Sequence, residues 1–70
     1  MDSKIKDIVS KNLKQARESI GLTQQQVADI MQTKQNIYSR YETGNLELDY
    51  YKIDFLCRLF DITPNDLFGF

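Results

Sequence analysis

The chain has 70 residues, of which 41% are hydrophobic and 27% charged, and its nine basic and ten acidic side chains give a net charge of -1. A chain of this length and composition forms one small globular domain, so we expect residues 1–70 to be a single domain. With no histidine and one cysteine, it is poorly suited to acid-base catalysis, zinc binding or an internal disulfide. We therefore expect no enzyme activity, no metal and no cofactor.

Apolar stretches are only a few residues long, and residues 1–10 carry acidic side chains where a signal peptide has an apolar core. These features predict a cytoplasmic protein with no membrane segment.

Charge is distributed unevenly along the chain. Residues 1–20 carry five basic and three acidic side chains, residues 21–44 carry two of each, and residues 45–70 carry two basic and five acidic ones. A locally positive surface is therefore expected only in the first two thirds.

The first predicted element is an amphipathic helix over residues 4–19, with Ser3 as its N-cap and Gly21 ending it. Its apolar side chains recur at steps of three and four. The stripe consists of Ile5, Ile8, Val9, Leu13, Ala16 and Ile20.

A second helix is predicted over residues 24–31, because Thr23 and Gln26 have the spacing of a capping box. Val27, Ile30 and Met31 form its apolar side, and the small Ala28 marks where a neighbouring helix can approach. The third helix is predicted over about residues 34–42. Thr33 is the nearest capping residue, and Gly44 ends the element.

Asp49 is the predicted N-cap of a fourth helix, and Thr63, Pro64 and Asp66 start a short fifth helix that reaches Phe68. No segment alternates between polar and apolar residues as a strand does, so the predicted fold is all-α with five helices. Cys57 is expected to be a small buried hydrophobic residue. The inward stripe of the fourth helix is Tyr50, Ile53, Leu56, Cys57 and Phe60.

From residue 9 to residue 68, the order and spacing of these signals resemble the Cro and CI-repressor type of helix-turn-helix regulator, the XRE family. The resemblance implies a five-helix, lambda-repressor-like DNA-binding domain with the helix-turn-helix motif at about residues 23–42. It also implies a recognition helix in the major groove and a two-fold dimer on a palindromic operator in double-stranded DNA. The matching residues are Leu13, Arg17, Gly21, Leu22, Thr23, Gln24, Val27, Ala28, Ser39, Arg40, Tyr41, Glu42, Gly44, Ile62, Thr63, Asp66 and Leu67, together with the apolar spacing over residues 50–60.

On this basis we expect a sequence-specific DNA-binding transcriptional regulator, repressor-like, with no small-molecule ligand. The alternative is a protein-interaction module, such as an antitoxin or an accessory regulator, whose contact with DNA is weak. The acidic C-terminal third favours this alternative. The two remain open at this point.

The resemblance assigns base contacts to Gln35, Asn36 and Arg40. The chemistry agrees, because Gln and Asn pair with adenine N6 and N7, and Arg pairs with guanine O6 and N7. The alternative is that these residues are simply solvated on an exposed helix face, and Arg40 has a phosphate contact as a further alternative. Ile37 either contacts a thymine methyl group or packs inward while Tyr38 turns outward, and the sequence leaves both arrangements open.

Phosphate contacts are expected where backbone amides are free and polar side chains are short, at the start of the second helix and in the loop after the third. Lys11 and Lys14 carry suitable charge, although a solvated face is the preferred interpretation for them. The predicted phosphate-binding residues are Thr23, Gln24, Lys34, Ser39, Thr43 and Asn45.

Arg17 and Glu42 match a structural pair that, in the family, ties the recognition helix to the first helix. Three residues depart from the family pattern. Gln32 replaces the usual turn glycine, Tyr38 replaces a β-branched aliphatic residue, and Lys34 stands where a capping Ser or Thr is common. Because Tyr38 stands at a position that packs against the neighbouring helix in the family, its hydroxyl needs a hydrogen-bond partner.

The fourth helix has a second apolar row, displaced from its inward stripe, and further apolar residues lie in the C-terminal segment. One small core cannot cover all of this surface, and exposed apolar patches usually mark association. We expect a homodimer, with a C-terminal segment that folds back over the patch as the alternative. The predicted dimer interface is Tyr51, Phe55, Leu59, Phe68 and Phe70.

Overall fold

The computed structural model describes residues 2–70, with side chains from residue 4 onward, and within this part of the chain all regular structure is helical. The prediction of an all-α, five-helix fold is confirmed. None of the helices in this part is both long and apolar enough to cross a membrane. The helices are α1 (Asp2–Ser19), α2 (Gln24–Ile30), α3 (Gln35–Glu42), α4 (Tyr50–Phe60) and α5 (Pro64–Phe68).

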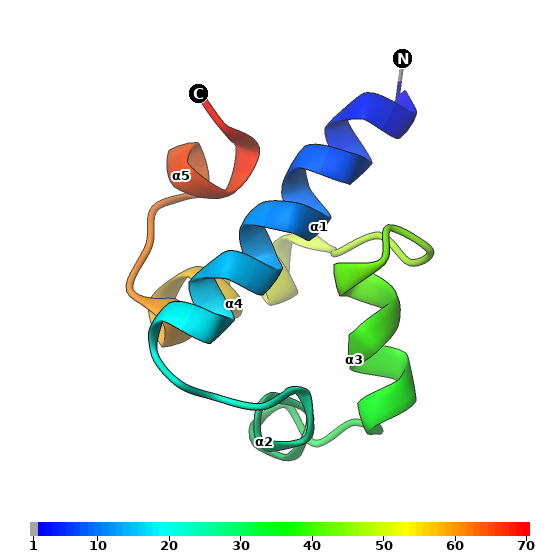
Figure 1. Cartoon of the computed structure of the whole chain (residues 1–70), viewed down its shortest axis with the longest axis vertical. Coiled ribbons are helices and arrows are strands. Elements are labelled where there is room, and N and C mark those ends of the chain that lie inside the picture. The colour runs from blue at the N-terminus through cyan, green and yellow to red at the C-terminus, as the bar shows by residue number, and fades with distance from the viewer. Residues whose placement is uncertain (1) are drawn as a thin grey trace.

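The long helix α1 runs through the middle of the molecule and packs against α3 and α5 (Figure 1). Helix α2 packs against α3 at one end of the molecule, and α4 packs against α5. The first turn of α1 and the end of the chain after α5 lie at the end of the molecule opposite α2 (Figure 1). This arrangement leaves the outer side of the α2–α3 pair uncovered by other helices.

Three helix starts follow from local capping. The Thr23 hydroxyl accepts from the amide of Gln26 at 3.1 Å, and the Gln26 side chain accepts from the amide of Thr23 at 2.8 Å, as the sequence predicted. Thr63 and Asp66 form the same reciprocal pair at the start of α5. The carboxylate of Asp49 accepts from the backbone N–H three residues on, at 2.9 Å, and begins α4. Each cap satisfies amide donors that have no partner within the helix.

Two predicted caps are wrong. Helix α1 already includes Asp2, so Ser3 lies inside the helix and does not precede it. Lys34, not Thr33, occupies the N-cap of α3, and its side chain makes no capping bond. The carbonyl of Lys34 accepts from the amides of Ile37 and Tyr38 at 3.0 Å, so α3 begins after Lys34. Thr33 stays in the turn that closes α2, where its amide donates to the carbonyl of Ala28 at 2.9 Å.

The core forms where the five helices meet. Tyr38 is fully buried, whereas Ile37 is half-buried at the edge of the core, so the ring of Tyr38 turns inward. The prediction that Cys57 is buried is confirmed. The buried hydrophobic residues are Leu13, Ala16, Val27, Ala28, Tyr38, Tyr41, Leu56, Cys57, Phe60 and Leu67.

Four residues predicted to face inward are exposed. Ile5 and Ile20 lie near the two ends of the apolar stripe of α1, beyond the helices that cover its middle. Ile30 is the last residue of α2, and Tyr50, the first residue of α4, is 90% exposed. Helical periodicity assigns the correct side of each helix but does not say where along its length that side is covered.

A contact between the first and last helices completes the fold. The side-chain amide of Asn12 donates to the carbonyl of Leu67 at 3.0 Å and to that of Asp66 at 3.2 Å. These carbonyls lie near the end of α5, where no further helical turn supplies donors. Asn12 therefore links α5 to α1 across 55 positions of sequence.

Candidate nucleic-acid interface

Helices α2 and α3 are joined by a turn over residues 31–34 and cross closely. Ala28 of α2 is fully buried, as expected for a small residue that allows a neighbouring helix to approach. Gln32 has a φ of 58°, which is the left-handed conformation that glycine adopts most easily. A side chain in this conformation costs about 1–2 kcal/mol, so the turn is formed at the expense of stability.

A buried ion pair joins α3 to α1. Arg17 Nε donates to Glu42 Oε2 at 2.7 Å, and Arg17 Nη2 donates to Glu42 Oε1 at 3.1 Å, so the guanidinium binds both carboxylate oxygens. The two side chains are only 9% and 2% exposed. Arg17 Nη1 also donates to the carbonyl of Leu22 at 2.7 Å. The structure thus brings together the two residues that the sequence analysis paired.

Glu42 has two further donors. The hydroxyl of Tyr38 donates to Oε2 at 2.5 Å, and Nε2 of Gln24 donates to Oε1 at 2.9 Å. Burial alone raises the pKa of Glu42, but the hydrogen bonds from Arg17, Tyr38 and Gln24 outweigh it and lower the pKa below its ordinary value. Burial and the bond to Glu42 raise the pKa of Tyr38, and the hydrogen bond to Glu42 raises that of Arg17. Glu42 is therefore an ionised and fully hydrogen-bonded carboxylate.

This network reaches the first residue of α3. Gln35 Nε2 donates to Gln24 Oε1 at 2.7 Å, so a continuous series of side-chain contacts runs from Arg17 through Glu42 and Gln24 to Gln35. An amide group has two N–H donors and an acceptor oxygen. Gln35 therefore keeps its oxygen and one N–H for another partner, while its position is fixed by Gln24.

The other predicted base-reading residues lie differently. Asn36 and Arg40 are exposed and four residues apart, so they share the outer side of α3. Arg40 forms no ion pair among the described residues. Ile37 is half-buried and packs against the core, so it is less accessible than Asn36 and Arg40.

The predicted phosphate-binding residues lie at the start of α2 and on or beside α3. Lys34 is the N-cap of α3, whereas Thr43 and Asn45 follow its last residue. Thr23 and Gln24 lie at the start of α2, and Gln24 reaches α3 through its bonds to Gln35 and Glu42. Asn45 Nδ2 donates to the hydroxyl of Thr43 at 3.0 Å, and this hydroxyl donates to the carbonyl of Arg40 at 3.3 Å. Ser39 is half-buried, and its hydroxyl donates to the carbonyl of Asn36 at 3.1 Å.

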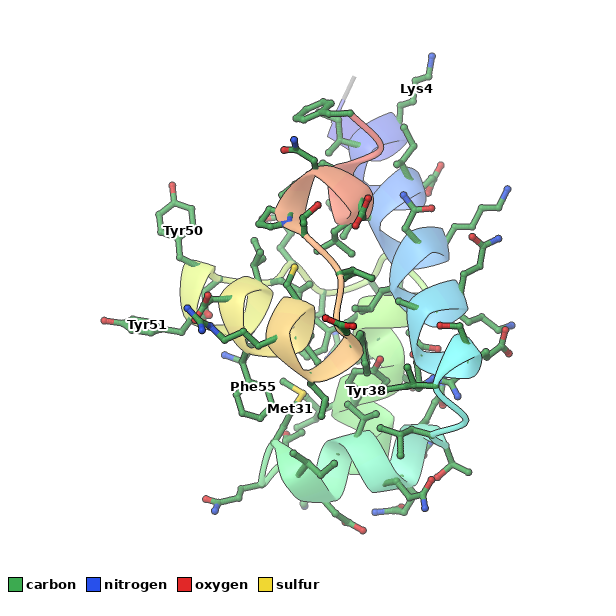
Figure 2. The ribbon with its side chains drawn as sticks, turned by 90° about the vertical axis from the view of Figure 1, so that its left-hand side faces the viewer. Lys4, Met31, Tyr38, Tyr50, Tyr51 and Phe55 are labelled. Atoms are coloured by element: carbon green, nitrogen blue, oxygen red, sulfur yellow. The ribbon has the colours of Figure 1, made fainter. Side chains whose placement is uncertain are left out.

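The five residues predicted to form a dimer interface do not form one patch. Tyr51 and Phe55 project from α4 beside Met31, the residue that follows α2 (Figure 2), and the three line one shallow hollow. Phe68 stacks on Phe70, with ring centres 6.1 Å apart, near a different hollow. The side chain of Leu59 is partly buried against the core.

The paired helices and the polar outer side of α3 define a helix-turn-helix DNA-binding domain. Residues 10–69 match the model of the family described as helix-turn-helix domain. The chain belongs to this family, and its resemblance to the XRE type is confirmed. A similar protein is the antitoxin PezA of Streptococcus pneumoniae serotype 4, which is 34% identical over 62 residues.

The aligned segment covers 89% of this chain and 39% of PezA, so the chain spans about two fifths of the length of this relative. No solved structure shows a significant match.

Sequence reasoning missed Gln24 and Tyr38 as partners of Glu42. The signal for Tyr38 was present, because residues 38 and 42 are one helical turn apart in a predicted helix. Gln24 is 18 positions from Glu42, and no local pattern indicates that contact.

Proposed function

We propose that this domain binds a specific sequence in double-stranded DNA and acts as a repressor-like regulator of transcription, with α3 in the major groove. The observation that carries the proposal is the contact between Gln24 and Gln35. It fixes the amide of Gln35 at the start of α3, where helices of this class meet the bases, and leaves one donor and one acceptor free.

The free groups of Gln35 match adenine, which offers N7 as an acceptor and N6–H as a donor. Asn36, next along the helix, offers the same chemistry, and Arg40 offers the fork that guanine O6 and N7 accept. Ile37 has the weakest case as a base reader, since it is packed at the edge of the core. Each bidentate contact contributes about 1–3 kcal/mol of discrimination between bases.

We assign phosphate contacts to Thr23 and Gln24 at the start of α2, to Lys34 and Ser39 at the start and in the middle of α3, and to Thr43 and Asn45 after its end. These contacts set the register of α3 but carry no sequence information. The net charge of -1 gives weak attraction at long range, so affinity should depend strongly on short-range fit.

We further propose a two-fold dimer on a palindromic operator, with recognition helices roughly 34 Å apart. Tyr51, which is 88% exposed, and Phe55 are the interface residues with the strongest support, because they project together from α4. Phe68 and Phe70 form a second apolar contact surface, and Leu59 supports α4 from the inside.

A second candidate is a protein-interaction module of the antitoxin type. It is favoured by the similarity to PezA, which is named as an antitoxin, and by the acidic residues 45–70. A domain of this kind would contact a partner protein through the C-terminal third and bind DNA weakly.

Selection of binding sites from random duplex DNA, followed by titration at several salt concentrations, tests the proposal. We expect salt-dependent binding to the selected site, which the double variant Gln35→Ala and Asn36→Ala abolishes. The matched control is Gln15→Ala with Gln25→Ala, because both are exposed glutamines outside α3 and neither is a predicted DNA contact. Absence of salt-dependent binding, or equal affinity of the double variant, would contradict the proposal.

Sedimentation at tens of micromolar, with and without the selected DNA, tests the dimer. A dimer that Tyr51→Ala and Phe55→Ala together dissociate is the expected result. A monomer under both conditions would contradict the proposed dimer interface.

A further inference from the structure

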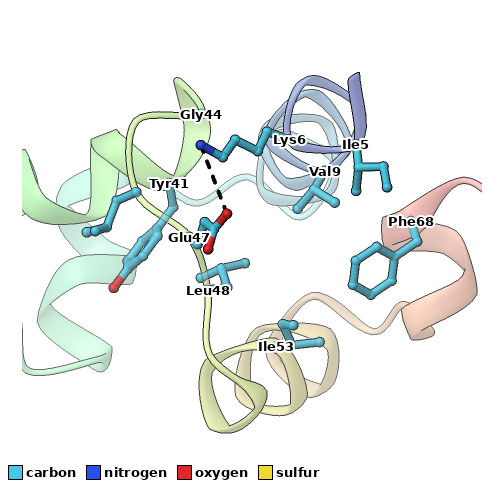
Figure 3. A pocket seen from close by; sticks show the side chains of 10 residues that line it. Ile5, Lys6, Val9, Tyr41, Gly44, Glu47, Leu48, Ile53 and Phe68 are labelled. Carbon is cyan, nitrogen blue, oxygen red and sulfur yellow. Dashed lines mark ion pairs between the residues drawn. The ribbon is translucent and has the colours of Figure 1, made fainter. Parts of the chain in front are cut away.

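A hollow of about 310 Å³ lies on the side of the molecule formed by α1, the segment after α3, α4 and α5 (Figure 3). We call it the α1–α5 pocket. It lies at the C-terminal end of α3, whereas Gln35 lies at the N-terminal end. The residues that line it are Ile5, Lys6, Val9, Tyr41, Gly44, Leu46, Glu47, Leu48, Ile53 and Phe68.

The interior of the α1–α5 pocket is apolar. Val9, Leu48, Ile53 and the ring of Phe68 face a common space, and Ile5 stands beside them (Figure 3). These side chains come from three helices and one loop, so no single element closes the pocket. Its volume falls at the lower end of the range of about 300–1,000 Å³ that is usual for ligand pockets.

The two charged residues of the lining neutralise each other. Lys6 Nζ lies 4.0 Å from Glu47 Oε2, and the pair spans the wall between α1 and the loop (Figure 3). Both side chains are largely exposed, so they keep most of their hydration. A charged ligand would meet one attractive and one repulsive group here, and the pocket therefore offers no net charge to bind.

We propose that the α1–α5 pocket binds an uncharged apolar small molecule with one or two aromatic rings or a branched alkyl group. An enclosed apolar cavity of about 150 Å³ is enough to bind benzene. A larger, half-open pocket lined by Val, Leu, Ile and Phe side chains gains binding free energy by covering apolar surface of both partners. The inference is independent of the assignment of bases to α3.

Methyl NMR on the whole chain tests the site, with toluene and naphthalene as probes. We expect saturable shifts of the methyl groups of Ile5, Val9, Leu48 and Ile53, together with nuclear Overhauser effects from probe to these methyls. Benzoate and benzylammonium have a ring like that of toluene but carry a charge. We expect them to bind at least tenfold more weakly.

A filling variant, Val9→Phe, should weaken toluene binding at least tenfold, whereas Ile30→Phe, on α2 and outside this pocket, should leave it unchanged. The wild-type Overhauser effects decide the question if Val9→Phe does not fold. The proposal is overturned by absence of saturable shifts, by contacts confined to other methyls, or by equal binding of the charged probes. Shifts of the same methyls that depend on chain concentration and that the probes do not change would assign the pocket to a second copy of the chain and would also overturn it.

Discussion

The hydroxyl of Tyr38 donates to Oε2 of Glu42 at 2.5 Å, one turn further along α3, and both side chains are buried. A tyrosine ring thus fills the space between α3 and the core, and its polar end reaches the carboxylate that also binds Arg17. The inner side of α3 is therefore fixed to α1 by hydrogen bonds, while the outer side stays free.

The first prediction concerns this hydroxyl. Tyr38→Phe keeps the ring but removes one donor from a buried carboxylate, so the free energy of unfolding should fall by about 1.5–3 kcal/mol. Urea denaturation measures the change. Tyr41→Phe is the matched control, because Tyr41 is also buried and its hydroxyl has no hydrogen bond among the described residues. An equal loss in both variants would argue against a special role for the Tyr38 hydroxyl.

Removal of the carboxylate should be more severe. Glu42→Ala leaves Arg17 buried without its partner, which typically costs about 3–5 kcal/mol. The total stability of a domain of this size is only a few times larger, so a large fraction of the molecules should be unfolded near room temperature. Circular dichroism during heating provides the measurement, and Glu47→Ala, which removes an exposed carboxylate, provides the control. Unchanged thermal stability of Glu42→Ala would show that the ion pair between Arg17 and Glu42 does not stabilise the fold.

Stability should also depend on pH through Glu42. Its pKa in the folded state is lowered from the ordinary value of 4.5, so the folded state holds this proton less tightly than the unfolded state does. The contribution is therefore fully present above about pH 4.5 and is lost as the pH falls through the lower folded pKa. Glu42→Gln should flatten the fall in unfolding free energy over this acidic range, as measured by denaturation at successive pH values. A fall as steep as that of the wild type would assign the acid sensitivity to other carboxylates.

The contact between Gln24 and Gln35 should appear as coupling in DNA binding. Gln24→Ala releases the amide of Gln35, and Gln35→Ala removes that amide. Each of these two single variants therefore loses part of the same interaction. The double variant should differ from the sum of the single ones by about 0.5–3 kcal/mol in binding free energy. Titration of the selected duplex gives all four affinities. In the control cycle between Gln24 and Arg40, which share no hydrogen bond, the changes in binding free energy should be additive. If the changes were also additive for Gln24 and Gln35, Gln24 would not position Gln35.

The left-handed turn residue offers a gain in stability. Gln32→Gly removes the strain of a side chain at a φ of 58°, and the free energy of unfolding should rise by about 0.5–1 kcal/mol after the entropic cost of glycine. Asp61→Gly tests the same effect at a φ of 57°, where the gain should be smaller because Asp tolerates this conformation better. Thermal unfolding of the two variants side by side is sufficient. A loss of stability in Gln32→Gly would mean that its side chain makes a favourable contact.

The starts of α2, α4 and α5 were predictable because their caps are local. Thr23 with Gln26, and Thr63 with Asp66, are three residues apart, so the chemistry that begins each helix is visible in the sequence. The start of α3 was misplaced by one residue because Thr33 belongs to the turn after α2, where its amide donates to the carbonyl of Ala28, and the extent of that turn depends on how α2 ends.

Contacts between distant residues were only partly predictable. Family resemblance paired Arg17 with Glu42, but nothing in the local sequence connects Gln24 to Glu42 or Asn12 to Leu67. The proposed interface residues fall on two surfaces for the same reason. Periodicity groups side chains within one helix, whereas the placement of α5 against α1 separates Phe68 from Tyr51 in space.

The link from Asn12 to the carbonyls of α5 has a consequence for the order of folding. Helix α1 is synthesised first, but the fully buried Leu67 that completes its cover is made 54 residues after Leu13. Helix α2 and α3 can pair earlier, because they are neighbours in the chain. On the ribosome, the helix-turn-helix unit can therefore be assembled while part of the inner face of α1 is still in contact with water.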